Sequence, residues 1–172
     1  MVLRADAQRN LERVLDAATE VFAASGPAAS VDEIARRAGV GHATVFRRFA
    51  TKDDLMYAVI ERRIAEIRDI VEAELQAPDP GEAFFRATEK IAALHMDAPG
   101  LHECVHHCGK PGATELDVLA EELIARAQRA GGLRRDVKAG DISTLMKSAL
   151  QSAPPDSWRR YLAVVLDGLR TR

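Results

Sequence analysis

Residues 30–52 read SVDEIARRAGVGHATVFRRFATK, and this stretch predicts two short helices joined by a tight turn. Ser30 followed by Glu33 is a capping-box pattern, which starts a helix, and Gly39 supplies the left-handed residue that commonly ends one. A second short helix is predicted over residues 42–49, with Val45 on its apolar face. Two helices joined by a short turn that contains glycine form a helix-turn-helix, whose second helix enters the major groove of DNA.

Helix signals extend this pattern on both sides. Thr51, with Asp54 three residues later, predicts the start of a long helix that continues to about residue 75. On the N-terminal side, apolar residues at three-and-four spacing over residues 11–22 predict an amphipathic helix, which Ser25-Gly26-Pro27 ends. Its apolar face would support the two short helices, so we expect a three-helix head.

The rest of the chain also shows helical periodicity and no strand-like alternation of useful length. Further helices are predicted to begin near residues 79, 114, 141 and 156, each bounded by Pro or Gly. We therefore predict an all-α fold of about nine helices. Residues 1–50 would form the helix-turn-helix DNA-binding domain, and residues 51–172 a helical effector-binding and dimerisation domain. For residues 101–111 the sequence leaves both a helix and a loop open.

Composition narrows the possible functions. No apolar run is long enough to span a bilayer, the N-terminus lacks the apolar region of a signal peptide, and two cysteines do not make a secreted disulfide framework. We therefore expect a cytoplasmic protein with no membrane partner. A net charge of −2 argues against unspecific coating of nucleic acid. A local basic patch is nevertheless predicted, because no acid interrupts the series Arg36, Arg37, Arg47, Arg48 and Lys52.

The runs EIARRAGV at residues 33–40, TVFRRF at 44–49 and TKDDL at 51–55 together resemble the TetR family of bacterial transcriptional regulators. The likeness covers roughly residues 11–60, and AGGLRRDV and WRRYLAVVLDGLR near the C-terminus are similar to segments of actinobacterial members. The resemblance implies a regulator, most often a repressor, that binds a palindromic DNA operator as a homodimer and is released by a small-molecule effector. It implies neither enzymatic activity nor a cofactor.

The resemblance also places individual residues at the DNA. His42 would meet a purine N7 and Ala43 a thymine methyl group. Phe46 stands where a tyrosine is usual in the family, so a phenol contact to phosphate is missing and the ring is expected to serve packing. Gly41 replaces the usual serine cap. The predicted DNA-binding set is Gly41, His42, Ala43, Thr44, Phe46, Arg47, Arg48 and Lys52.

Two further surfaces follow from the resemblance. An effector pocket between the long helix and the helices after it would be lined by Phe84, Phe85, Thr88, Ile91, His95, Met96 and Leu123, although these residues suit an ordinary core equally well. The last two helices would pair with those of a second subunit as a four-helix bundle. That interface would use an apolar stripe on the last helix, made of Trp158, Tyr161, Leu162, Val165, Leu166 and Leu169. The alternative is that these residues belong to the core of their own chain.

Histidines and both cysteines are concentrated between residues 95 and 108. On a helix, His102 and His106 lie one turn apart, as do Cys104 and Cys108, and either pair could ligate a metal. A reversible Cys104–Cys108 disulfide is another interpretation. Because the spacing is not a well-defined zinc pattern, we predict no metal or cofactor. A helical metal-binding or redox-sensing protein, or a metalloenzyme, remains the alternative function, and an interaction module that has lost DNA binding is a third.

Overall fold

The computed structural model describes residues 2–108, 113–154 and 156–171, which contain nine α-helices, one short 3-10 helix and no strand. The elements are α1 (Val2–Ser25), η1 (Gly26–Ala28), α2 (Val31–Ala38), α3 (His42–Arg48), α4 (Lys52–Leu75), α5 (Pro80–Asp97), α6 (Pro99–Cys108), α7 (Ala113–Arg129), α8 (Ala139–Ser152) and α9 (Trp158–Leu169). The predicted all-α fold is confirmed. None of these helices combines the length and the apolar character that crossing a membrane requires.

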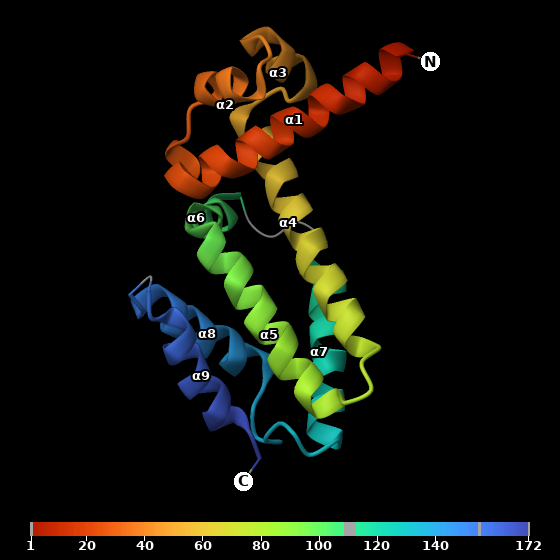
Figure 1. Ribbon diagram of the computed structural model, residues 1–172, viewed down its shortest axis with the longest axis vertical. Helices are drawn as coiled ribbons and strands as arrows, with labels where there is room; N and C mark the ends of the chain where they lie inside the picture. The colour runs from red at the N-terminus through yellow and green to blue at the C-terminus, as the bar shows by residue number, and fades with distance from the viewer. Residues whose placement is uncertain (1, 109–112, 155, 172) are drawn as a thin grey trace. The chain divides into compact units, whose positions relative to one another are not determined.

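The helices gather into two compact units, each with its own core (Figure 1). Unit 1 comprises Met1–Ile64 and Asp97–Gly112, and unit 2 comprises Ala65–Met96 and Ala113–Arg172. By its contacts α6 therefore belongs with α1 to α3, although it follows α5 in the chain. The predicted boundary after residue 50, between a DNA-binding domain and an effector-binding and dimerisation domain, stays a prediction.

Two of the predicted helix boundaries carry the expected bonds. Gly39 ends α2 in the left-handed conformation, with φ of 65°, and its N–H donates to the Ala35 carbonyl. At the start of α4 the Asp54 N–H donates to Thr51 Oγ1 at 3.1 Å, while the Thr51 N–H donates to Asp54 Oδ2 at 2.9 Å. These reciprocal bonds form a capping box. They fix where α4 begins, with three residues between it and the end of α3.

The start of α2 differs from the prediction. Ser30 precedes α2 in an extended conformation, but its hydroxyl accepts no bond from an amide of the helix. Glu33 does not reach back to Ser30 because Arg36, one turn later, holds its carboxylate with Nε at 3.0 Å and Nη2 at 2.7 Å. The bond from Arg36 also lowers the pKa of Glu33. The predicted capping box at Ser30 is therefore wrong, since an ion pair along the helix surface has replaced it.

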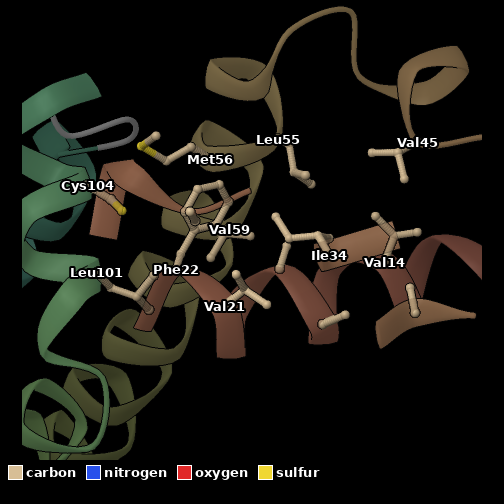
Figure 2. Packing of buried hydrophobic residues seen from close by; sticks show 14 of the residues in the cluster. Val14, Val21, Phe22, Ile34, Val45, Leu55, Met56, Val59, Leu101 and Cys104 are labelled. Atoms are coloured by element: carbon tan, nitrogen blue, oxygen red, sulfur yellow. The ribbon is translucent and has the colours of Figure 1, made fainter. Parts of the chain in front are cut away.

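The core of unit 1 holds α1, α2, α3, the first half of α4 and α6 together (Figure 2). Phe22 on α1 and Ile34 on α2 are fully buried, and Figure 2 shows them beside Val59 of α4. Burying a side chain of this size contributes about 1.5–3 kcal/mol. The remaining members that Figure 2 labels are Val14, Val21, Val45, Leu55, Met56, Leu101 and Cys104. This shared core sets the position of α3.

The segment whose conformation the sequence leaves open is a helix over Pro99–Cys108. This helix, α6, packs against α1 and η1, and Leu101 and Cys104 enter the core of unit 1 (Figure 2). Gly100 lies at the contact, close to the backbone carbonyl of Ala23. The absence of a side chain at Gly100 therefore allows α6 to approach α1 at backbone distance.

Unit 2 contains the second half of α4 with α5, α7, α8 and α9, and α8 and α9 lie side by side (Figure 1). Its core includes Phe85 on α5 and Leu166 on α9. The Arg170 guanidinium lies 3.9 Å from the centre of the Phe85 ring and pairs with Glu82 at 2.5 Å. These contacts attach the C-terminal end of α9 to the start of α5.

Glu74, near the end of α4, is a buried carboxylate in unit 2 with 7% of its side chain exposed. It accepts hydrogen bonds from Arg86 Nε at 3.0 Å and from Lys90 Nζ at 2.8 Å, both on α5. Burial raises the pKa of Glu74, but the bonds from Lys90 and Arg86 outweigh it and hold the pKa below its usual value. The ionised carboxylate therefore ties α4 to α5.

Replacing Glu74 with glutamine is expected to lower the free energy of unfolding by about 1–2 kcal/mol at pH 7. Because the folded-state pKa lies below the unfolded value, this contribution is present above about pH 4.5 and is lost as the pH falls through the folded-state pKa. Urea unfolding at pH 7, 5, 4 and 3 should therefore show a constant difference between the wild type and the variant down to pH 5, and convergence of the two below about pH 4.5. Glu72→Gln, at an exposed site on α4, is the control, and an equal loss there would contradict the assignment.

Candidate nucleic-acid interface

Helix α3 is attached to unit 1 by one apolar face. Val45 is 1% exposed, and Phe49 packs against the same core just after the helix ends. His42 and Ala43, at the start of the helix, are exposed, and Gly41 before them is extended and also exposed. Because α3 is only seven residues long, this one anchoring face leaves the rest of its surface open. The first turn of α3 is therefore accessible to a partner.

The cations of α3 lie beside an open groove. Arg47 Nη2 donates to Thr44 Oγ1 at 2.9 Å, which holds that guanidinium along the helix. Arg48 is exposed and forms no ion pair with any residue that the structure describes. Both arginines line the groove, together with Gln8 and Asn10 of α1. An exposed positive edge of this kind suits phosphate oxygens, which arginine binds with two parallel N–H groups.

The basic patch is smaller than the sequence predicts. Arg36 is paired with Glu33, and Arg37 lies 3.0 Å from Glu20 and 3.7 Å from Glu33. The acidic partners come from α1 and from the first turn of α2, upstream of the acid-free stretch. The uncompensated positive charge is therefore concentrated on α3.

Lys52 has an intramolecular role that the sequence did not indicate. Its ammonium donates to the Pro27 carbonyl at 2.6 Å and lies 3.5 Å from the Ala29 carbonyl. These bonds tie the start of α4 to the segment that leads into α2. An ammonium has three donors, so DNA binding by Lys52 stays a prediction beside this structural role.

His42 has two neighbours that bear on base recognition. Its Nε2 lies 3.4 Å from Asp32 Oδ1 on α2, and both side chains are well exposed. The imidazole also meets the Phe46 ring edge-on, with centroids 4.7 Å apart and an angle of 66° between planes. Phe46 therefore packs against His42, in agreement with the packing role expected for its ring. Asp32 was not among the predicted site residues, because ten positions separate it from His42 in the sequence.

The described histidine and cysteine candidates are divided between the two units. His95 lies on α5 in unit 2, whereas His102, Cys104 and Cys108 lie on α6 in unit 1, and the side chain of His106 is outside the described residues. In the part of the chain that the structure describes, no three His, Cys, Asp or Glu side chains are grouped to hold a metal. The described residues therefore give the metal-binding alternative no support.

Both thiols lie in apolar surroundings. Burial raises the pKa of Cys104 to about 11, and the neighbouring Cys108 and Glu103 add to this rise. Burial also raises the pKa of Cys108, whose Sγ lies 3.4 Å from Met56 Sδ on α4. Thiolate, the form that attacks oxidants and ligates metals, is therefore scarce at neutral pH. This environment favours a packing role over redox sensing.

The predicted effector residues all belong to unit 2, on α5 and α7. Phe84, Phe85, Thr88 and Leu123 are buried in its core, and Ile91, His95 and Met96 are partly buried. The Thr88 hydroxyl donates to the Phe84 carbonyl at 2.8 Å, and His95 Nδ1 lies 2.9 Å from the Ile91 carbonyl oxygen. The aromatic residues thus have the core role that the sequence left open. Effector binding by this set stays a prediction.

The predicted dimer stripe on α9 divides into two groups. Trp158, Leu162, Leu166 and Leu169 are buried in the core of unit 2, so burial within their own chain already accounts for them. Val165 is partly buried, and Tyr161 is exposed. The large apolar residues that α8 and α9 expose are Leu145, Tyr161 and Val164. Two of these, Leu145 and Val164, were absent from the predicted stripe.

Comparison with known proteins covers both parts of the chain. Residues 14–59 match the family described as bacterial regulatory proteins, tetR family. Residues 79–171 match the C-terminal domain described as transcriptional regulator SbtR-like. The first match contains the whole of α2 and α3, and the second contains α5 to α9. Both α3 and the helices α5 to α9 thus have counterparts in known protein families.

Individual relatives agree with these matches. A crystal structure of a TetR transcription regulatory protein from Mycobacterium vanbaalenii is 40% identical, with a TM-score of 0.72, over 98% of this chain and 99% of that one. A TetR regulator from Streptomyces coelicolor is 29% identical, with a TM-score of 0.69, over 93% and 98%. An HTH-type transcriptional repressor from Mycobacterium tuberculosis is 43% identical over 49% of this chain. The match spans 45% of the length of that curated relative.

Proposed function

Since the chain belongs to the TetR family of bacterial regulatory proteins, we propose that it is a ligand-responsive repressor that binds a palindromic operator as a homodimer and is released by a small-molecule effector. The observation that carries the DNA-binding part is α3, which Val45 anchors and which exposes His42, Ala43 and two arginines. The M. tuberculosis relative is described as a repressor, which supports the proposed direction of regulation.

In the proposed complex, α3 enters the major groove. His42 and Ala43 in its first turn read base edges, while Thr44, Arg47 and Arg48 contact phosphates. One α3 is too short to recognise a long site, so two copies would bind half-sites about one or more helical turns apart. A two-fold dimer matches a palindromic operator because both have the same symmetry.

The proposed effector binds unit 2. Because Phe84, Phe85 and Leu123 fill the core there, a ligand among them must bind a conformer in which this core is more open. Such a ligand stabilises that conformer by its differential affinity for the two states. If the open conformer holds the two heads at a spacing that does not match the half-sites, binding of the effector weakens binding of DNA. Because this coupling is reciprocal, DNA weakens binding of the effector by the same free energy.

The proposed function is tested by titrating purified protein against labelled duplexes and following fluorescence anisotropy. The first duplex is the region upstream of the protein's own gene, and a scrambled duplex of equal composition is the reference. Tight binding to one fragment, with the stoichiometry of a dimer, supports a regulator. If selection from random duplexes also yields no preferred sequence, the proposed function is wrong and the interaction-module interpretation replaces it.

Arg48→Ala and Lys52→Ala are expected to differ, although both remove a cation near DNA. Arg48→Ala should weaken binding to all duplexes alike and reduce the salt dependence by about one ion per head, with unchanged thermal unfolding. Lys52→Ala should also lower the unfolding temperature, because the bond to the Pro27 carbonyl is lost. Anisotropy titrations at several salt concentrations, together with thermal melts, separate these effects. A melt of Lys52→Ala identical to that of the wild type would contradict its structural role.

A further inference from the structure

Two residues that follow α9, Arg170 and Thr171, lie against the segment that follows α7 in unit 2. The Thr171 N–H donates to the Gly132 carbonyl at 3.1 Å, and an isolated antiparallel bridge joins Arg170 to Leu133. We call Arg170 and Thr171 the latch. Its partner segment is held by backbone packing, because a Cβ atom at Gly132 would lie 2.6 Å from Cα of Gly81 on α5. The latch therefore rests on a fixed support.

The side chain of Arg170 covers the ring of Phe85, a residue of α5 that is only 2% exposed. The guanidinium lies 3.9 Å from the centre of the ring. Its Nη1 and Nη2 lie 2.5 Å and 3.1 Å from the two carboxylate oxygens of Glu82, one turn earlier on α5. The bond from Arg170 lowers the pKa of Glu82, so the carboxylate is ionised at neutral pH. A charged group thus covers an aromatic residue of the core, and a second charge holds it there.

Moving Arg170 away is an inexpensive way to expose Phe85. The side chain of Arg170 is already 41% exposed, so its guanidinium is hydrated and can turn into water. Ion pairs with this exposure contribute little to stability. By contrast, the contact between α4 and α5 buries the carboxylate of Glu74, 7% exposed, between two cations. Opening the core there would leave a buried charge without its partners.

An open hollow of about 820 Å³ lies beside the latch, and its walls include Arg170, Thr171, Gly168 and Leu133. Sites for small molecules have volumes of about 300–1,000 Å³. Arg170 borders this hollow and also covers Phe85. Leu133 borders it as well and is fully buried in the core of unit 2. Movement of the guanidinium would therefore join the hollow to the aromatic part of the core.

We propose that the latch controls ligand access to the core of unit 2, and that release of Arg170 from Glu82 and Phe85 admits an apolar effector from the hollow. This inference rests on the proposed function, because it identifies how the effector reaches its site. The apparent affinity of a ligand is reduced by the fraction of protein in the binding-competent state. The strength of the latch therefore sets the effector concentration at which the regulator responds.

Binding of Prodan, a neutral and apolar fluorescent dye, measures access to the core. Trp158 is the single tryptophan of the sequence and is buried in unit 2, so energy transfer from it detects dye bound near this core. Arg170→Ala should bind Prodan about tenfold more tightly than the wild type, since it loses one exposed ion pair and one cation–π contact. Glu82→Gln should bind with intermediate affinity, because the guanidinium keeps its contact with the ring.

Arg68→Ala is the matched control. Arg68 on α4 pairs with Glu115 on α7 at 3.2 Å, and its side chain is 37% exposed, compared with 41% for Arg170. This variant loses a similar ion pair of the same unit but should bind Prodan as the wild type does. Urea unfolding of every variant confirms that it is folded. Equal dye affinity of the wild type and Arg170→Ala overturns the proposal, and so does an equal gain in Arg68→Ala.

Amide hydrogen exchange locates the opening. The Thr171 N–H should exchange about tenfold faster in Arg170→Ala than in the wild type, in parallel with the gain in dye affinity. The Gly132 N–H, which donates to the Ala127 carbonyl on the fixed side, should exchange at the same rate in both proteins. Unchanged exchange at Thr171 would show that Arg170 does not hold the latch closed, and it overturns the proposal.

Operator binding separates this inference from the proposed function. Prodan should weaken operator binding at about a tenfold lower dye concentration in Arg170→Ala than in the wild type. The dye and exchange measurements need no DNA. A protein that prefers no duplex, or whose operator affinity is the same with and without bound dye, therefore overturns the proposed regulation, while the expected difference in dye affinity still supports the latch.

Discussion

Gly100→Ala is expected to lower the free energy of unfolding by about 2–3 kcal/mol, the upper part of the range for overpacked sites. A Cβ atom at this position would lie 2.6 Å from the Ala23 carbonyl oxygen and 2.9 Å from the Gly26 nitrogen. These are backbone atoms of α1 and η1, so they cannot move aside as the end of a flexible side chain can. Helix α6 would have to move away from α1, and Leu101 and Cys104 would lose part of their burial.

Urea unfolding measured by circular dichroism tests this expectation. Gly140→Ala is the matched control because Gly140 is also the second residue of its helix, α8, and a Cβ there would meet no neighbour within 4 Å among the described residues. That substitution should be neutral or stabilising by about 0.5–1 kcal/mol, since alanine favours a helix more than glycine does. Similar destabilisation at both glycines would show that the effect does not depend on the backbone contact, and would contradict the close approach of α6 to α1.

Sequence patterns predicted the helix boundaries correctly where the capping hydrogen bonds join residues within one helical turn. Thr51 and Asp54 form the expected capping box, and Gly39 has the expected left-handed conformation. Both features depend on residues within one helical turn. The same reasoning failed at Ser30 because Arg36, which lies on the next turn of α2, competes for the carboxylate of Glu33. A capping pattern read from two residues does not include that competitor.

Contacts between distant residues explain what the sequence did not reveal at the candidate site. Lys52 bonds to the Pro27 carbonyl, 25 residues earlier, and no periodic pattern indicates such a bond. Asp32 comes beside His42 only because the turn folds α2 and α3 together. By contrast, the exposure of His42 and Ala43 and the burial of Val45 follow from helical periodicity, and the structure agrees with it. Periodicity therefore identifies the face of α3 but not its neighbours.

The α9 stripe illustrates a further limit. Periodicity shows that Leu162 and Leu166 occupy a buried face, but it does not show which chain buries them. In the structure, the core of unit 2 already buries both. If α8 and α9 also form a dimer interface, the residues available for it are the exposed apolar ones, Leu145, Tyr161 and Val164. Val164 is 69% exposed, which is unusual enough for a valine on a helix to make it the best site for a test.

Val164→Glu is therefore expected to dissociate the proposed dimer and to weaken operator binding by about a hundredfold or more. A carboxylate buried without a partner in an apolar interface is strongly unfavourable. A monomer also loses the gain that comes from linking two heads on one operator, which is about 10²–10⁴ in affinity. Analytical ultracentrifugation gives the oligomeric state, and anisotropy with the operator duplex gives the affinity. Binding to a single half-site should change little, because α3 lies in unit 1 and its residues are untouched.

Val118→Glu provides the control, because Val118 is a valine of comparable exposure, 62%, on α7 of the same unit. It makes the same change of charge and hydrophobicity away from α8 and α9, so the dimer and the operator affinity should be retained. If Val118→Glu dissociates the protein and Val164→Glu does not, the interface lies on α7. If neither variant changes the oligomeric state, the exposed apolar residues of α9 do not form the interface. Only selective loss with Val164→Glu supports pairing through α8 and α9.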